Sequence, residues 1–396
     1  MDLLQQYKKD LEIELFRILD FWQKNTLDKI NGGFYGRMDN DNKIFQDAPK
    51  GSVLNSRILW AFSGAYNLTK NPEYLIVAER AFRYIKDFFI DKEFGGVYWT
   101  VDYNGKPLDT KKQIYALAFA IYGLSEFYIS SKNEEAKELA IELYNTILKY
   151  SYDNKNGGYI EALTHDWNPI ADLRLSKKDA NEKKSMNTHL HVLEGFANLY
   201  RIWTDEDLKE RITELIYIFL NHIIDPETHH LVLFFDEKWN PKSTIISYGH
   251  DIEAAWLMRE AAEIIADKNL IQKIKEQSIL VTSAVTEGLD KDGGLWYEYD
   301  TADDNLVKEK HWWSQAEAMI GFFNAWEITN NVEYLDQSVS SWHFIKEHII
   351  DKQNGEWFWG INKDNSVMNE DKVGVWKCPY HNSRSCIELI ERMNKA

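Results

Sequence analysis

Apolar residues recur at helical spacing along most of this chain, and some of the helices they predict have a single apolar side. Between residues 72 and 89, Tyr74, Ala78, Phe82 and Phe89 form one stripe, and charged residues occupy much of the remaining surface. A helix with this pattern packs one side on a core and turns the other to water. We expect six such helices, starting near residues 2, 72, 133, 205, 269 and 331.

A second kind of segment is apolar nearly all round. Residues 52–68 and 113–128 are examples. A helix of this kind has to be buried on most of its faces. Six of them, starting near residues 52, 111, 185, 248, 311 and 381, alternate strictly with the six amphipathic helices.

Short segments rich in glycine and aromatic residues recur at intervals of roughly 60 to 75 residues, a spacing typical of a repeat architecture. Each pairs turn-forming glycines with alternating aromatic or β-branched residues, which predicts a short strand or hairpin. The six segments are NGGFYG (31–36), FGGVYW (94–99), NGGYIE (156–161), HLVLFF (230–235), GGLWYE (293–298) and NGEWFWG (354–360), and the fourth lacks the glycines.

This alternation predicts an all-α fold, an (α/α)6 barrel of six inner and six outer helices with short β-hairpins in the connecting loops. A linear solenoid would need polar capping repeats at its ends, whereas the terminal helices here resemble the others. No linker rich in Pro, Gly or Ser divides the chain, which has only 7 prolines. We therefore expect a single domain over residues 1–396.

The charge and composition of the chain limit the classes of molecule that it is expected to bind. A net charge of −17 disfavours binding to nucleic acid or an anionic membrane, and no stretch approaches the roughly 20 apolar residues of a membrane span. The segment MDLLQQYKKDLEIELF is typical of an amphipathic helix, without the apolar centre of a signal peptide. The two cysteines, Cys378 and Cys386, lie too far apart for a CxxC metal pair, and we expect a monomeric cytosolic protein with free thiols.

In a barrel of this kind, the first turns of the inner helices open on one face. Free N–H groups and the helix dipole stabilise negative charge at helix N-termini. Histidines and an arginine gathered there would therefore suit a site that stabilises an oxyanion while moving protons. The candidates at these positions are Arg57, Tyr115, Asn187, His189, His191, His250, Glu253, Trp312, Trp313, Glu317 and His381.

Three of the histidines, His191, His250 and His381, occupy comparable positions in different repeats. This favours a functional role over the usual one of a satisfied core residue. His189 lies two residues before His191, so both cannot point the same way on a helix. We expect His191 to point inward, because a glutamate follows both His191 and His250 by three residues. A carboxylate at that spacing either fixes the tautomer of the imidazole or bonds elsewhere.

Simpler interpretations apply to several other candidates. Arg57 could be a structural ion-pair partner, although an arginine in a nearly all-apolar helix needs either a partner or a ligand. Trp312, Trp313 and Trp376 could all be core residues.

A zinc site is the alternative for the three histidines. His191, His250 and His381 would have to converge to about 2 Å from one ion, and no HExxH motif or short ligand pair supports this. His229 and His230 are adjacent in a loop, and we expect them at the surface.

Longer strings around these candidates carry a resemblance to a known family. They are LNSRILW, MNTHLHVLE, SYGHDIEAAW, the tryptophan pair before QAEA, and WKCPYHN. Together they make the chain similar, over essentially its whole length, to the N-acylglucosamine 2-epimerase superfamily and, within it, to the cellobiose 2-epimerases. The resemblance implies an (α/α)6 barrel, in agreement with the helix pattern.

The resemblance also implies roles for particular residues. His250 and His381 would be the acid/base pair at C2 of a sugar, and His191 would assist ring opening and closing. The implied contacts to the sugar are Arg57, Tyr115, Asn187 and Glu253, with Trp313 and Trp376 as stacking residues, and we place Glu317 in the same substrate-binding set.

The implied reaction inverts C2 of the reducing-end glucose of a β-1,4-linked disaccharide, converting cellobiose to glucosyl-mannose and lactose to epilactose. Ring opening exposes the aldehyde, which acidifies the C2 proton. One histidine removes this proton to give an enediolate, and another returns a proton to the opposite face. Arg57 suits the enediolate oxygens because it cannot lose its charge. We expect this chemistry to need no metal or other cofactor.

Other functions stay open at this point. A monosaccharide 2-epimerase or aldose–ketose isomerase of the same superfamily would use the same intermediate. A glycoside hydrolase would need two carboxyl groups about 5 to 9.5 Å apart across the scissile bond; Glu253 and Glu317 could supply them, but the three histidines would then have no role. A non-catalytic protein would bind sugar without turnover.

Overall fold

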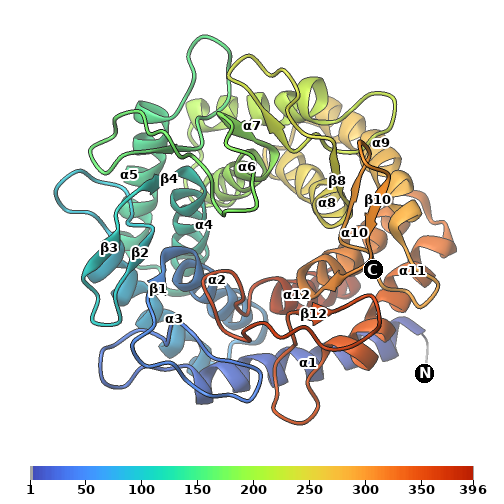
Figure 1. Cartoon of the computed structure of the whole chain (residues 1–396), viewed down its shortest axis with the longest axis horizontal. Helices are drawn as coiled ribbons and strands as arrows, with labels where there is room; N and C mark the ends of the chain where they lie inside the picture. The colour runs from blue at the N-terminus through green and yellow to red at the C-terminus, as the bar shows by residue number, and fades with distance from the viewer. Residues whose placement is uncertain (1–2, 396) are drawn as a thin grey trace.

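The computed structural model describes residues 3–395, and within these residues twelve α-helices form two concentric rings (Figure 1). The inner ring consists of α2 (Ser52–Thr69), α4 (Ile114–Ser131), α6 (Met186–Tyr200), α8 (Tyr248–Ile264), α10 (Trp312–Thr329) and α12 (His381–Lys395). The outer ring consists of α1 (Leu3–Asn25), α3 (Pro72–Tyr84), α5 (Glu134–Tyr150), α7 (Glu206–Ile218), α9 (Lys268–Val285) and α11 (Val332–Phe344).

The inner ring is closed. Each inner helix packs against the next one, and α12 packs against α2 as well as α10. Every outer helix lies against an inner one, and α1 covers α12, so the first and last helices of the chain are neighbours (Figure 1). The predicted (α/α)6 barrel is therefore confirmed, and its helices begin within about three residues of the predicted starts.

Burial follows the two sequence patterns. In α5 a single stripe is buried, whereas in α4 every residue from Ile114 to Phe127 is buried. The expectation that no segment approaches a membrane span was wrong for α4, because Ile114–Ser131 is long and apolar enough to qualify. However, 78% of that segment is buried inside the barrel. Its apolar composition is thus explained by its place in the inner ring.

The helices of the two rings begin differently. A side chain caps the first turn of five outer helices by accepting a backbone N–H bond, whereas α2, α4, α8 and α10 of the inner ring have no such cap. Uncapped first turns keep N–H groups for neighbouring loops or for a ligand. The outer caps are Asn71, Asn133, Asp205, Asp267 and Asn331.

Six equivalent hairpins follow the outer helices, as the glycine-aromatic segments predict. Each is closed by one antiparallel bridge, and the fourth hairpin forms like the others although it lacks the glycines. There His229 adopts the left-handed conformation, with φ of 64°, that a glycine adopts in the other five hairpins. The six bridges are Leu27–Phe34, Ile90–Val97, Tyr152–Tyr159, Ile224–Leu231, Leu289–Leu295 and Ile350–Trp357.

Short antiparallel strands join each repeat to the next, and a bridge between Met38 and Val373 joins the last repeat to the first. The pairs are β1 (Lys50–Gly51) with β2 (Thr100–Val101), β4 (Lys112–Gln113) with β5 (Ala162–Leu163), β6 (Lys184–Ser185) with β7 (Phe234–Phe235), β8 (Ile245–Ser247) with β9 (Glu298–Asp300), and β11 (Lys310–His311) with β12 (Gly360–Ile361). β3 (Pro107–Asp109) extends the first sheet beside β2, and β10 (Asn305–Val307) extends the fourth beside β9.

A buried lysine holds the hairpin turn in five of the six repeats. In the second repeat, Lys112 binds the carboxylate of Asp91 and the carbonyl of Gly95, while Asp91 accepts two backbone N–H groups of the turn. Burial alone would raise the pKa of Asp91, but Lys112 and these N–H groups lower it to about 2. Four of the lysines lie two residues before the start of an inner helix, so in those repeats the turn and the helix start are held together. The five pairs are Lys50–Asp28, Lys112–Asp91, Lys184–Asp153, Lys310–Asp290 and Lys372–Asp351.

Replacing Lys112 by methionine should lower the free energy of unfolding by about 3–5 kcal/mol, because it removes the buried ammonium that holds the Asp91 carboxylate. Urea unfolding at pH 7 measures the change. Lys86→Met is the control, since Lys86 pairs with Glu135 in the solvent, with side chains 36% and 57% exposed, and should cost less than about 1 kcal/mol. Equal losses in the two variants would contradict the structural role of the buried pair.

Candidate active site

Predicted site residues from α2, α4 and α6 meet where the inner helices begin. Nη2 of Arg57 donates to the hydroxyl of Tyr115 over 2.8 Å, and the guanidinium lies 4.1 Å from the centre of the Phe119 ring. The Tyr115 ring in turn meets the edge of His191 at 5.0 Å. Within residues 3–395, Arg57 forms no ion pair, and its buried Nε has no hydrogen-bond partner. The interpretation of Arg57 as a structural ion-pair partner is therefore disfavoured.

His191 is supported by the carboxylate that follows it by one helical turn. Its Nδ1 lies 2.9 Å from Oε2 of Glu194, which confirms this pairing from the sequence. An ionised carboxylate can only accept, so the ring proton sits on Nδ1 and Nε2 keeps a free lone pair. Burial lowers the pKa of His191, partly opposed by Glu194. The ring is therefore neutral at physiological pH.

His189 points away from this cluster and has a structural role. Its Nε2 accepts the backbone N–H of Tyr159 in the neighbouring hairpin over 2.9 Å, and its Nδ1 donates to the carbonyl of Ser185 over 2.6 Å. Asp251 and Gln315, at the same position of two other inner helices, accept the equivalent hairpin N–H. The choice of His191 over His189 as the inward residue agrees with this arrangement.

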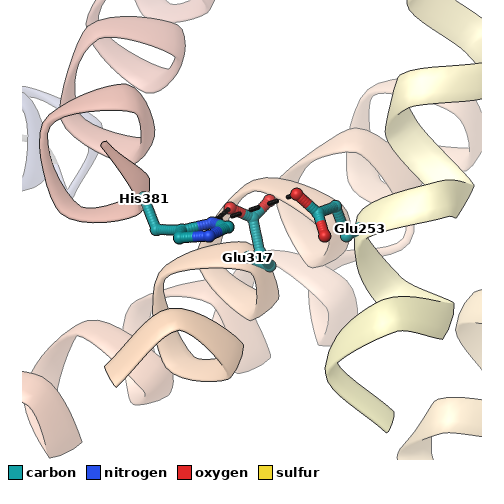
Figure 2. Close-up of side chains that lie close together, drawn as sticks. All are labelled: Glu253, Glu317 and His381. Atoms are coloured by element: carbon teal, nitrogen blue, oxygen red, sulfur yellow. Dashed lines mark hydrogen bonds and ion pairs between the residues drawn. The ribbon is translucent and has the colours of Figure 1, made fainter. Parts of the chain in front are cut away.

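His381 is supported by two buried glutamates from α8 and α10 (Figure 2). Its Nδ1 lies 2.7 Å from Oε1 of Glu317 and 3.9 Å from Oε1 of Glu253. Burial lowers the pKa of His381 well below its usual range, and the charges of Arg57 and Arg384 lower it further. Burial and the neighbouring Glu317 charge raise the pKa of Glu253 to about 8, so this carboxyl keeps its proton at neutral pH.

His250 is supported differently. Its Nδ1 lies 2.8 Å from the hydroxyl of Ser247, and burial lowers its pKa to about 3. The expected pairing with Glu253 does not form, because that carboxylate turns towards the guanidinium of Arg384 instead. The ring of Trp313 lies 4.6 Å from the ring of His250 and 5.8 Å from that of His381, so the two histidines share one aromatic neighbour.

The remaining predicted residues divide into two groups. Trp312 is 3% exposed and packs on Trp359, which is the core role left open for it. Trp313, Trp376 and Asn187 are half-buried at the same end of the barrel. Trp376 contacts the Tyr115 ring at 5.9 Å, and the buried side-chain oxygen of Asn187 has no hydrogen-bond partner among the described residues. These three residues remain available for contacts to a ligand.

One central residue was missing from the candidates. Arg384 is completely buried, and its guanidinium binds the carboxylates of Glu194, Glu253 and Glu317. The sequence contained a signal for it, because Arg384 follows His381 by three residues and so shares its helix face. The glutamates beside His191 and His381 are thus joined through one positive charge.

The comparisons with known proteins agree with this geometry. A model of the family N-acylglucosamine 2-epimerase (GlcNAc 2-epimerase) matches residues 33–385. This chain belongs to that family. A cellobiose 2-epimerase from Bacteroides fragilis is 48% identical over 389 residues, which cover 98% of both chains, and one from Dictyoglomus turgidum is 39% identical over 97% of this chain and 99% of its own. The solved structure of cellobiose 2-epimerase from Bacillus thermoamylovorans B4167 superposes with a TM-score of 0.94, at 38% identity over 98% of this chain and 100% of that one.

The expectation that His230 lies at the surface was wrong. In this member of the family, His230 is 5% exposed, and its Nδ1 lies 2.7 Å from Oδ2 of Asp251. The cause is the fourth hairpin, where His229 and His230 stand in place of the glycine pair, so that the second ring reaches beneath the start of α8. His229 is half-buried.

The geometry also bears on the metal and hydrolase alternatives. Among the described residues, the one group of three potential metal ligands within 4.8 Å of one another is Glu253, Glu317 and His381, not the three histidines. The guanidinium of Arg384 already supplies a positive charge to that group. Because both carboxylates bind the same nitrogen of Arg384 and are buried, they do not flank a space about 5 to 9.5 Å wide that a glycosidic bond could occupy.

The imidazoles of His250 and His381 should stay neutral from pH 8 down to pH 5, because burial lowers both pKa values. Nitrogen-15 NMR of labelled histidines, assigned with single substitutions, measures this and should place the His381 proton on Nδ1. Since the unfolded rings titrate near about 6.5, the folded protein binds fewer protons below that pH, and its free energy of unfolding should fall as the pH drops from about 6.5. Rings that titrate near 6.5 in the folded protein would contradict this.

Proposed function

We propose that this protein is an epimerase that inverts C2 of the reducing-end sugar of a β-1,4-linked disaccharide such as cellobiose or lactose, through an enediolate. One observation carries the proposal. Two buried imidazoles from different helices, His250 and His381, adjoin one tryptophan, and the guanidinium of Arg57 lies at the same end of the barrel without an ion-pair partner among the described residues. The relatives that are 48% and 39% identical over nearly the full length are both cellobiose 2-epimerases, which supports this choice of substrate.

The first step opens the sugar ring. The free lone pair on Nε2 of His191 accepts the proton of the anomeric hydroxyl as the bond between C1 and the ring oxygen breaks, and the same proton then passes to the ring oxygen. This leaves an aldehyde at C1. Glu194 stabilises the transient imidazolium, because its carboxylate holds Nδ1–H at 2.9 Å.

The second step exchanges the C2 proton. One imidazole takes this proton, the electrons of the C–H bond form a C1–C2 double bond, and the aldehyde oxygen becomes negative. Arg57 donates a hydrogen bond to the developing charge. The other imidazole takes up a proton from water once the negative charge has formed and delivers it to the opposite face, and the electrons return to restore the aldehyde. The first imidazolium then releases its proton to water. The enediolate raises the proton affinity of both rings, because an opposite charge nearby favours the charged imidazolium.

Incubation with cellobiose in deuterated water tests the proposal. We expect the mannose-containing epimer, with deuterium at C2, by NMR. A panel of cellobiose, lactose, mannose and N-acetylmannosamine distinguishes a monosaccharide enzyme of the same family. Release of free glucose would favour hydrolysis, and binding without turnover would favour a sugar-binding protein.

His250→Ala and His381→Ala should each lower the rate of C2 exchange by about 10²-fold or more, the scale of lost acid–base catalysis. Circular dichroism should show that both variants remain folded. His189→Gln is the matched control, because Gln315 makes the equivalent hairpin bond in another repeat, and it should keep exchange within about twofold of the wild type. A near wild-type rate in either alanine variant would remove that histidine from the mechanism.

Trp376→Ala should mainly raise KM, by about tenfold, while leaving kcat similar. An aromatic ring that stacks on a sugar binds ground state and transition state alike, and losing it costs on the order of 1 kcal/mol. Steady-state kinetics with cellobiose measures the two constants. An unchanged KM would show that Trp376 only packs against Trp99 and Tyr115.

We extend the proposal to a monomeric, cytosolic enzyme that needs no metal or other cofactor. The free and buried thiols of Cys378 and Cys386 support a reducing compartment.

A further inference from the structure

We propose that Arg384 is a positioning residue that couples the two histidine sites of the epimerisation, by holding the carboxylates behind His191 and His381 in place. The inference rests on the proposed function for its catalytic consequence. Arg384 is completely buried beneath the site. Its effect therefore reaches the sugar through other residues.

The two ends of the guanidinium lead to different histidines. Nη1 donates to Oε1 of Glu194, whose other oxygen holds Nδ1 of His191 at 2.9 Å. Nη2 donates to Oε1 of Glu317 over 2.7 Å, and the same oxygen accepts from Nδ1 of His381 over 2.7 Å. Each histidine is thus separated from Arg384 by a single carboxylate.

Two further contacts complete the cluster. Nη2 also donates to Oε1 of Glu253 over 2.5 Å, and this carboxyl lies 3.9 Å from His381. The hydroxyl of Tyr380 donates to Glu194 and accepts from Nη1. One planar group therefore orders side chains from α6, α8, α10 and α12. A lysine could supply the charge but could not reach all three carboxylates, because its ammonium is a single point without a rigid fork.

The charge of Arg384 keeps the buried carboxylate of Glu194 ionised, so that it can accept from Nδ1 of His191. Glu194, Glu253 and Glu317 are each 1% exposed or less by side chain, and burial favours the protonated form of a carboxyl. Arg384 and His191 outweigh burial at Glu194 and lower its pKa. Glu253, with its pKa raised to about 8, already holds one proton. Without Arg384, Glu194 would bind a proton more readily.

Loss of Arg384 would change the tautomers of His191 and His381. A protonated glutamate would donate its proton to Nδ1, and the imidazole would then carry its own proton on Nε2. That tautomer has no lone pair on Nε2, the atom available to the sugar, so it cannot act as a base there. By donating to Glu194 and Glu317, Arg384 orients both carboxylates to accept from Nδ1, and so holds His191 and His381 in the base-competent tautomer.

Two substitutions separate charge from geometry. Arg384→Lys keeps the charge but loses the fork, so kcat should fall by about tenfold or more, with the acidic limb of the kcat–pH profile unmoved. Arg384→Gln also removes the charge, which lowers the pKa of both His191 and His381 in the wild type. Its acidic limb should therefore move to higher pH by about one unit or more. KM should change little in both. The titratable groups that interact with Arg384 are Glu194, Glu253, Glu317, Tyr122, Tyr380, His191 and His381, and the charge of Arg57 acts on the same two histidines.

Arg259→Gln is the matched control. Arg259 also binds carboxylates from within the inner ring, Glu263 and Glu327, but it lies in the last turns of α8, away from His250. It should leave kcat and its pH profile unchanged. An Arg384→Lys variant with the wild-type kcat, or an Arg384→Gln variant with the wild-type acidic limb, would overturn the inference.

A double-mutant cycle tests whether Arg384 acts through Glu317. If it does, Arg384→Gln should reduce kcat much less in a Glu317→Gln background than in the wild type. Additive losses would contradict the coupling. If the Arg384 variants fail to fold, Glu194→Gln carries the test instead. Because Glu194 raises the pKa of His381 across the cluster, this variant should move the acidic limb of C2 exchange to lower pH, and an unmoved limb would overturn the inference.

A measurement that needs no substrate turnover can test the role of Arg384 independently of the proposed function. Nitrogen-15 shifts of the histidines in Arg384→Gln should show the ring protons of His191 and His381 moving from Nδ1 towards Nε2. Wild-type tautomers in a folded Arg384→Gln variant would overturn the inference even in an active enzyme. A wild type that exchanges no deuterium into cellobiose would instead contradict the proposed function.

Discussion

Opposite charges hold the buried lysines beneath the hairpins and the buried Arg384 in the inner ring, and the rest of the structure depends on these pairings, whereas the buried Arg57 has no such partner among the described residues. An isolated ionised group in the core would be neutralised or would unfold its surroundings. The chain meets this constraint twice, with lysines under the hairpins and with Arg384 at the centre of the inner ring. Buried pairs of this kind add little net stability compared with apolar residues, but removing one partner is costly. They therefore fix positions more than they increase stability, and positions are what a proton-transfer site requires.

The lysine–aspartate pairs position the inner helices, and the pairs of Arg384 with the glutamates position the histidines that these helices carry. Four of the lysine–aspartate pairs tie a hairpin turn to the segment directly before an inner helix, and this helps to set where the first turn of that helix begins. The first turns then carry Arg57, Tyr115, His191 and His250 towards one end of the ring. In the fourth repeat, the lysine pair is replaced by His230 and Asp251, and Asp251 is the neighbour of His250 in sequence. The repeat thus departs from its pattern directly beside a proposed acid–base residue.

Much of the fold could be predicted from the sequence because burial in a ring of helices imposes a local periodicity. The all-round apolar segments had to be inner helices, and strict alternation then left closure as the simplest arrangement. The His191–Glu194 pair was also predictable, since both residues lie on one helix face. The His250–Glu253 pair has the same spacing but does not form: Glu253 binds Arg384, which is 131 residues further along the chain, and Nδ1 of His250 bonds to Ser247 instead. Such long-range competition leaves no trace in local spacing, and neither does the burial of His230 by a hairpin that forms without glycines.

The unlike partners of His250 and His381 bear on how an inversion can run in both directions. Inversion with two bases requires one imidazole to hold a proton while the other lacks one. The carboxylate of Glu317 only accepts, and so it fixes the proton of His381 on Nδ1. The hydroxyl of Ser247 both donates and accepts, so it allows His250 to carry its proton on either nitrogen. A barrel of six similar repeats would naturally present equivalent groups at each helix start. Here the two histidines proposed to act on C2 differ, because Glu317 lies behind His381 and Ser247 lies behind His250. This difference lets His381 start as the proton acceptor, while His250 can change the nitrogen that carries its proton.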